Sequence, residues 1–188
     1  MAKKSKLKKV KHHPSQNPAA ETAPIAGFGP RLGALIYDSL IVIGVAALAS
    51  AIGMGIAEGL IYFNIVNIDG RYIDTAAYAG QQIWFSILVW GSVCGFYLWF
   101  WTHGGQTVGM RAWRLRVQNS DGTAISLTQA LIRLATAALG LGNLQVPFDQ
   151  KSRAFQDHWA HCDVLRLSKE QNGSLLRIAD KLEKNNNG

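Results

Sequence analysis

Residues 83–101, which read IWFSILVWGSVCGFYLWFW, decide the fold of this chain. They form the centre of a longer segment, 75–110, that contains no Asp, Glu, Lys or Arg. An α-helix rises about 1.5 Å per residue, so about 20 apolar residues cross the roughly 30 Å hydrocarbon core of a bilayer. A second apolar stretch, 32–57, holds one charged residue, Asp38. The sequence therefore predicts two transmembrane helices, over about 32–57 and 82–101.

The overall composition supports the same class of protein. Of the 188 residues, 48% are hydrophobic and 16% are charged, against about 25% charged residues in ordinary soluble domains. The apolar content excludes a disordered chain for most of the length. The chain has 2 cysteines, which excludes a secreted scaffold held by disulfides. We expect an all-α integral membrane protein.

The distribution of basic residues predicts the orientation of the two helices. Residues 1–30 carry six Lys and a single Glu, which is typical of a disordered basic tail. Residues 58–81 hold one basic residue, Arg71, and three acidic ones, whereas three Arg follow the second helix within 111–116. Lys and Arg are retained on the cytoplasmic side. We therefore expect a cytoplasmic N-terminus and an external loop over 58–81, with the Lys cluster acting on topology rather than binding nucleic acid.

A third apolar segment, about 126–148, admits two interpretations. It contains Arg133, a Gly-rich break at 140–142 and Pro147. One interpretation is a re-entrant or interfacial hairpin that packs against the two spans, since broken backbone at membrane depth must be covered by protein. The alternative is a third complete span, which would place the basic C-terminal region outside, against the orientation rule. The charge distribution favours the hairpin.

Two short alternating runs lie on either side of this third segment. Residues 114–118 and 163–167 have the alternation of β-strands, and a turn signal follows the first run. Pairing the two runs requires both on one side of the membrane, so we expect a small cytoplasmic β pairing. Residues 168–188 are polar and are interpreted as a C-terminal tail.

Three segments spread over 31–167 resemble the RDD family of small bacterial membrane proteins. They read Arg31-Leu-Gly-Ala-Leu-Ile-Tyr-Asp38, Gly105-Gln-Thr-Val-Gly-Met-Arg111 and Arg153-Ala-Phe-Gln-Asp157. The resemblance implies a multi-pass domain over 31–167 in the bacterial inner membrane. It also implies a name-giving triad, which consists of Arg31, Asp38 and Asp157. A second motif consists of Gly105, Gln106, Thr107, Gly109 and Arg111. Some family members are linked to cation/proton antiport.

The charged residues within the apolar segments need partners. Asp38 lies about two turns inside the first span, where an unpaired carboxylate costs of order 2.5–3.5 kcal/mol. Arg133 is expected at a similar depth, and we predict an intramembrane ion pair between Asp38 and Arg133. Arg31 is about two turns from Asp38 on the same face, too far for a direct bond. We expect Arg31 to meet Asp157, with Arg111 and Arg114 as rival partners in this pairing and lipid phosphate as the alternative partner for Arg31.

Metal and catalytic chemistry find little support in the sequence. One short segment offers side chains of the types that bind metals, namely Asp157, His158, His161, Cys162 and Asp163. No second cluster with the spacing of metal ligands accompanies it. The chain has no nucleophile elbow, no phosphate-binding loop and no HExxH motif. We therefore expect no catalytic residues, no metal and no cofactor.

Two functions of different class remain. The first is a structural or interaction module in the membrane, whose partners are the lipid bilayer and either further copies of the chain or another membrane protein. The alternative is an oligomeric cation/proton antiporter that uses Asp38, because two or three helices do not enclose a pathway alone.

Overall fold

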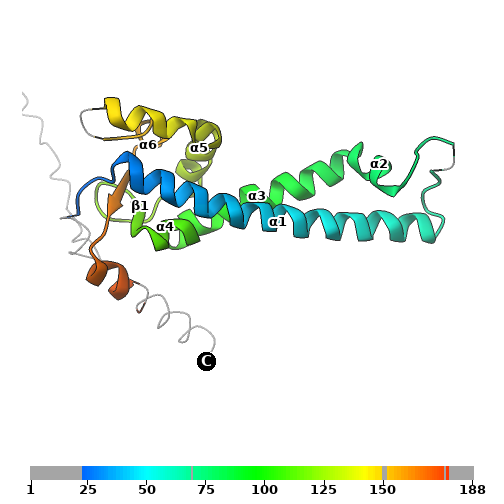
Figure 1. Ribbon diagram of the computed structural model, residues 1–188, viewed down its shortest axis with the longest axis horizontal. Helices are drawn as coiled ribbons and strands as arrows, with labels where there is room; N and C mark the ends of the chain where they lie inside the picture. The colour runs from blue at the N-terminus through cyan, green and yellow to red at the C-terminus, as the bar shows by residue number, and fades with distance from the viewer. Residues whose placement is uncertain (1–22, 69, 150–151, 176, 178–188) are drawn as a thin grey trace, which may run out of the picture.

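Two long apolar helices form the axis of the molecule (Figure 1). The computed structural model describes residues 23–68, 70–149, 152–175 and 177, so most of the expected basic tail lies outside the described residues. Helix α1 spans Phe28–Tyr62 and α3 spans Ile83–His103, lengths of about 52 and 31 Å at the α-helical rise. Both are long and apolar enough to cross a membrane. The two predicted apolar helices are therefore confirmed.

The surfaces of these helices suit an apolar surrounding. Leu40 and Ile43 of α1 are 68% and 65% exposed. Many other large apolar residues of both helices are also exposed. The buried positions in the second half of α1 are instead small residues four apart, Ala49, Gly53 and Ala57. A β-carbon on Gly53 would lie 2.8 Å from the ring of Phe85 in α3. The seam between the helices thus depends on a small residue that admits an aromatic ring.

The connection between α1 and α3 is closed by local polar contacts. Helix α2, Thr75–Gly80, begins at Asp74, whose Oδ1 accepts a 2.7 Å bond from the Ala77 amide. The Thr75 hydroxyl donates to Glu58 Oε2 over 2.7 Å. Tyr78 and the residues around it pack on the end of α1. Glu58 and Asp74 are therefore used to build the connection, while Asp69 lies outside the described residues.

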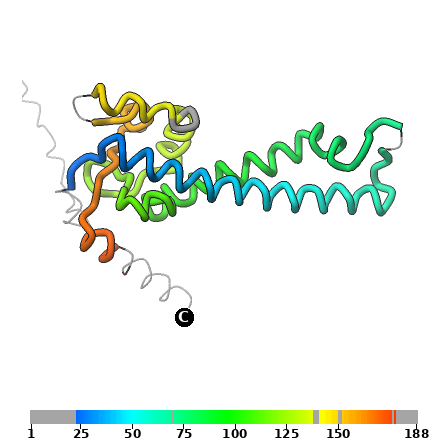
Figure 2. The backbone as a smooth tube through the Cα atoms, in the orientation of Figure 1, coloured from blue at the N-terminus to red at the C-terminus, as the bar shows by residue number. Residues whose placement is uncertain are grey.

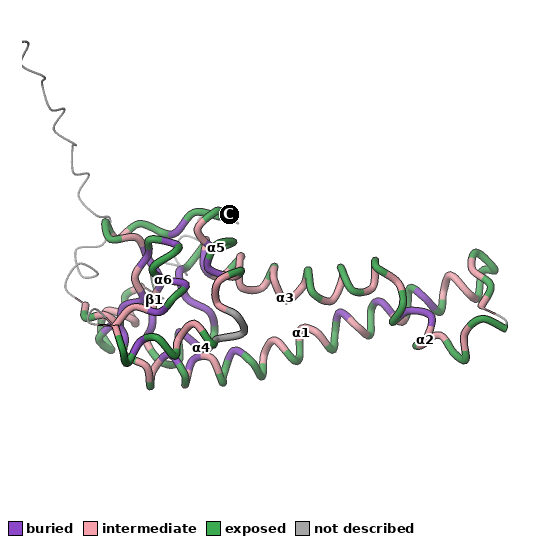
Figure 3. Tube along the Cα trace, turned by 90° about the horizontal axis from the view of Figure 1, so that it is seen from above, coloured by how far each residue is buried: buried purple, intermediate pink, exposed green. Residues whose placement is uncertain are grey.

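The remaining elements gather around the first turns of α1 (Figures 1 and 2). They are α4 (Val108–Ala112), β1 (Leu115–Gln118), α5 (Leu127–Ala137), the 3-10 helix η2 (Ala138–Phe148), α6 (Phe155–Trp159) and β2 (Asp163–Arg166). Most buried residues lie at this compact end, as Figure 3 shows. The protein is thus a compact end with a long helical hairpin that extends from it.

A small antiparallel sheet organises the compact end. Strand β1 pairs with β2, with Val117 opposite Val164, which confirms the predicted β pairing. The N-terminal segment lies along the other side of β2, since the Ala26 amide donates to the Val164 carbonyl over 2.8 Å. Residues 25 and 26, before the predicted boundary at residue 31, therefore pack against the sheet. Beyond β2, residues 169–175 are helical.

The third apolar segment changes helix type midway. Helix α5 has 11 residues, about 16 Å at the α-helical rise. The chain then continues as the 3-10 helix η2, which contains Pro147. The α-helix ends close to the expected Gly-rich break, because the sequence beyond Ala137 contains two glycines and a proline, which disfavour a regular α-helix.

Candidate functional site: a charge-paired pocket

The compact end is built around a buried carboxylate shared by two guanidiniums. Arg31 Nη1, from the first turn of α1, donates to Asp157 Oδ2 over 2.5 Å. Arg133 Nη1, from α5, donates to Asp157 Oδ1. The Asp157 side chain is fully buried, and those of Arg31 and Arg133 are nearly so. The expected contact between Arg31 and Asp157 is present, and Asp157 also binds a second arginine.

Backbone groups add further hydrogen bonds to this cluster. The Ala154 amide donates to Asp157 Oδ2 over 3.1 Å at the start of α6, and Arg31 Nε donates to the Ala26 carbonyl over 2.9 Å. Burial raises the pKa of the Asp157 carboxyl, but the guanidiniums of Arg133 and Arg31 outweigh burial and hold that pKa below its ordinary value. Asp157 is therefore a carboxylate that joins α1, α5 and α6.

Asp38 has a different set of partners from the expected one. Its Oδ2 accepts a 2.5 Å bond from the Thr107 hydroxyl, and its Oδ1 accepts a 2.8 Å bond from the Gly109 amide. The predicted ion pair between Asp38 and Arg133 is therefore wrong. Helix α4 presents its N-terminal donors directly to Asp38, since the first amides of a helix have no partner within it. Arg133 is instead occupied by Asp157.

The Gly-Gln-Thr motif explains how α4 reaches Asp38. Gly105 has a φ of +67°, the left-handed region that favours glycine. Thr107 is the N-cap of α4, and its hydroxyl also accepts from the Met110 amide over 3.2 Å. A β-carbon on Gly109 would clash with the Ala34 carbonyl oxygen of α1. The motif therefore lets the backbone of α4 touch α1.

The other motif residues bind within the same end of the molecule. Gln106 Nε2 donates to the Leu115 carbonyl over 2.7 Å and to Asn172 Oδ1 over 3.0 Å. Arg111 lies over the ring of Phe100, 5.7 Å from the ring centre. Every residue of the motif named from the sequence therefore has a structural contact.

Three of the five residues considered as metal ligands, Asp157, Cys162 and Asp163, contact arginines instead. Cys162 accepts a 3.4 Å bond from Arg133, and burial raises the pKa of its thiol. Asp163 lies 2.9 Å from Arg153. Among the residues that the structure describes, no group of three His, Cys, Asp or Glu side chains is placed to hold a metal ion.

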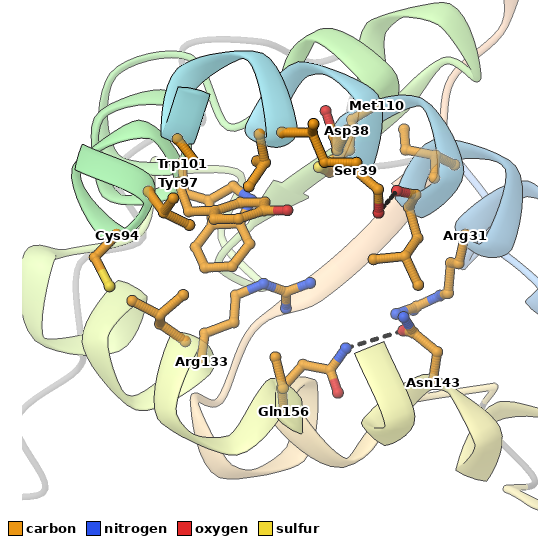
Figure 4. A pocket seen from close by; sticks show the side chains of 18 of the residues that line it. Arg31, Asp38, Ser39, Cys94, Tyr97, Trp101, Met110, Arg133, Asn143 and Gln156 are labelled. Atoms are coloured by element: carbon orange, nitrogen blue, oxygen red, sulfur yellow. Dashed lines mark hydrogen bonds between the residues drawn. The ribbon is translucent and has the colours of Figure 1, made fainter. Parts of the chain in front are cut away.

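A pocket of about 680 Å³ opens beside the ion cluster, between α1, α3 and α5 (Figure 4). Arg31, Asp38 and Arg133 line the pocket together with polar residues such as Asn143 and Gln156, and apolar side chains, most of them from α1 and α3, form most of the remaining wall. The guanidinium of Arg133 lies 5.1 Å from the Trp101 ring centre, a cation–π contact.

Most residues that line the pocket were not identified from the sequence as site residues, Trp101 and Gln156 among them. Trp101 fits an interfacial aromatic anchor by its position, yet it is 6% exposed and faces Arg133. Gln156 lies within the segment 153–157 and is 3% exposed. The sequence signal for Gln156 was its place between Arg153 and Asp157, because residues next to a buried charged residue often lie in the same buried site.

Two apolar helices that end in a charge-paired polar core define a membrane-associated helical protein. The chain belongs to the RDD family, whose model matches residues 25–161. No curated protein and no solved structure matches the chain.

Proposed function

We propose that the protein is a non-enzymatic structural or interaction module of the bacterial inner membrane, as its RDD family membership and apolar helices suggest. The observation that carries the proposal is the use of its buried charges. Arg31 and Arg133 each bind Asp157, and both oxygens of Asp38 accept hydrogen bonds from the start of α4. These groups hold the compact end on α1, which is a structural task.

The proposed topology places the compact end in the cytoplasm. The Lys-rich N-terminus and the arginines of 111–116 support this side. Strands β1 and β2 flank the third apolar segment and pair with each other, which supports a hairpin whose two ends lie on one side of the membrane. The 3-10 helix η2, which follows α5 directly, contacts α1, α5 and α6, which also supports a segment that folds back on the compact end.

Tags at the two termini test this topology. We expect tags at both the N-terminus and the C-terminus to stay inaccessible to a membrane-impermeant label in intact cells, while a cysteine placed in 63–74 reacts. A C-terminal tag labelled from outside would establish the third complete span instead.

The partners proposed for the module are lipid and a second membrane protein, either another copy of this chain or a different one. The exposed side chains of Leu40, Leu48 and Ile52 on α1, and of Ile87 and Trp90 on α3, offer apolar surface along both helices. Small residues and large apolar ones on such helices allow close packing with lipid or with other helices.

The antiporter alternative is tested at Asp38. In proteoliposomes we expect no cation-driven proton flux from the unchanged protein. We expect Asp38→Asn to lower stability by about 1–3 kcal/mol, because a charged acceptor of two buried hydrogen bonds is lost. Ser39→Ala is the matched control, since Ser39 also lines the pocket but donates only within α1. Flux that Asp38→Asn abolishes at normal protein abundance would establish the antiporter and remove the structural proposal.

A further inference from the structure

A second pocket, of about 480 Å³, lies at the edge of the small sheet. Its walls come from residues 23–24 of the N-terminal segment, from Arg114 before β1, and from residues 166–168 and Gln171 at the end of β2 and just beyond it. In Figure 1 the start of the described chain and the end of β2 lie on the side of the compact end opposite the helical hairpin. The volume is within the usual range of ligand sites, about 300–1,000 Å³.

Backbone hydrogen bonds hold the walls of this pocket together. The Arg166 amide donates to the Pro24 carbonyl, and the Leu167 amide donates to the Arg114 carbonyl, each over 2.8 Å. Arg166 also lies opposite Leu115 in the register of the strands, and Leu115 is the residue after Arg114. The strand pairing therefore brings the two arginines to neighbouring positions on adjacent strands.

The two positive charges in this pocket are not compensated by the protein. Arg114 is half-buried and Arg166 is exposed, and among the described residues neither guanidinium has an ion-pair or hydrogen-bond partner. No Asp or Glu lines the pocket, and the nearest acid along the chain, Glu170, is an exposed residue outside it. Like charges on neighbouring strands repel each other. The pocket therefore presents two accessible cations that an anion would stabilise.

The backbone at Arg114 points in the same direction. Arg114 has a φ of +57°, a conformation that residues other than Gly, Asn and Asp rarely adopt. Residues held in such conformations gather at ligand sites. A charged side chain at this position is thus in keeping with a binding role.

The donors around the pocket fit a phosphate group. A guanidinium presents a planar fork of N–H groups that matches two phosphate oxygens. The Ser168 Oγ accepts a 3.1 Å bond from the Gln171 amide, so the hydroxyl hydrogen can be donated to a further oxygen. A phosphate monoester carries a charge of about −1.5 to −2 near pH 7, which two arginines neutralise, whereas a carboxylate or a phosphodiester carries one negative charge.

We propose that this pocket binds the phosphate group of a water-soluble phosphate monoester. Arg114 and Arg166 each bind oxygens of the phosphate, and the Ser168 hydroxyl donates to it. The organic part of the ligand occupies the remaining volume, beside Pro24 and Leu167. In the topology proposed above, this side of the compact end faces the cytoplasm, so the ligand comes from solution rather than from the bilayer.

The test is calorimetric titration of the full chain in phosphatidylcholine nanodiscs. The probe is glycerol 3-phosphate, and dimethyl phosphate, a diester with one negative charge, is the control at equal ionic strength. We expect saturable, one-to-one binding of glycerol 3-phosphate that is at least ten-fold tighter than that of dimethyl phosphate, because one charged hydrogen-bonding interaction is lost with the diester. Nanodiscs that also contain phosphatidic acid should leave this binding unchanged. Both faces of a nanodisc are open to solution, so the result does not depend on the proposed topology.

A matched pair of variants locates the site. Arg166→Gln removes one guanidinium from the pocket, and Lys169→Gln removes the same charge from an exposed neighbour that does not line it. We expect Arg166→Gln to weaken glycerol 3-phosphate binding about ten-fold or more, while Lys169→Gln stays within about two-fold of the unchanged protein. Arg114→Gln, on the opposite wall, should weaken binding about as much as Arg166→Gln, and it provides the same test if Arg166→Gln does not fold.

Four results would overturn the proposal. The first is the absence of saturable binding of glycerol 3-phosphate to the unchanged protein. The second is dimethyl phosphate binding of equal strength, which would refute the preference for a monoester. The third is an equal loss in Lys169→Gln and Arg166→Gln, which would mean that diffuse surface charge attracts the anion. The fourth is loss of glycerol 3-phosphate binding when phosphatidic acid is present, which would assign the pocket to a lipid headgroup.

Discussion

The two ends of α1 are held by different kinds of contact. Near its start, Arg31 and Asp38 bind α6 and α4 through an ion pair and through charged hydrogen bonds. Near its end, Gly53 and Ala57 are buried against apolar and aromatic side chains of α2 and α3. Charged groups in a buried site need every partner at once, because a lone charge there is costly. Apolar packing tolerates gradual change, so the compact end should be the more sensitive to substitution.

The largest effect is expected at Asp157. Asp157→Asn removes the anion between two buried guanidiniums and should destabilise the protein by about 3–5 kcal/mol. Thermal unfolding in detergent measures the change. Asp163→Asn is the matched control, since its partner Arg153 is 34% exposed and such pairs contribute about 0–1 kcal/mol. Equal losses in the two variants would show that Asp157 acts as an ordinary surface acid.

Acid should destabilise the compact end of the molecule before it destabilises the seam around Gly53. The pKa of Asp157 in the folded protein is lowered by Arg133 and Arg31, although burial opposes them. The stability that Asp157 contributes is therefore fully present above the unfolded value of about 3.9 and is lost as pH falls through the lower folded value. We expect hydrogen exchange of α6 to rise below about pH 4 before that of the seam around Gly53. A loss of α6 protection already near neutral pH would contradict a lowered pKa.

The seam at the far end is expected to give an intermediate effect. Gly53→Leu places side-chain atoms where Phe85 now packs and should cost about 1–3 kcal/mol through overpacking. Gly44→Leu, on the same helix, is the control because nothing lies within 4 Å of a β-carbon there. Unfolding midpoints in detergent measure both variants. Similar midpoints for the two would mean that the seam does not pack as tightly as the structure shows.

The smallest effect is expected at the start of α2. Asp74→Ala removes the bond from the Ala77 amide and should cost about 1 kcal/mol, the usual value of a helix N-cap. Asp74→Asn keeps a side-chain oxygen and should retain most of the stability. Hydrogen exchange of the α2 amides reports the change locally. Loss of protection in α6 as well would show that the two ends are coupled.

The sequence predicted the parts of the fold that depend on local composition. The apolar stretches at 32–57 and 82–101 require helices of membrane length, and α1 and α3 are such helices. The alternating runs on either side of the third segment predicted the pairing of β1 with β2. Each apolar helix is encoded in one stretch of sequence, and the strand pair is encoded in two stretches with the same alternating pattern.

The sequence could not assign partners among several charges of similar depth. The sequence predicted Asp38 as the partner of Arg133, but in the fold Arg133 binds Asp157. The choice depends on where α4 begins, because the Thr107 hydroxyl and the Gly109 amide occupy Asp38. A helix N-terminus is a backbone donor that residue charges do not reveal. Trp101 was likewise missed as a pocket residue, because its position also suits an interfacial anchor.

The pairing of Arg31 with Asp157 joins residues 126 positions apart, and this separation has a consequence for biosynthesis. The ribosome makes Arg31 126 positions before Asp157, and it makes Arg133 24 positions before Asp157. Until that aspartate is available, Arg31 and Arg133 have no anion to share, and the compact end cannot close on α1. Each new copy therefore stays open until Asp157 has been made, and a chain truncated before Asp157 would leave both arginines without their shared anion.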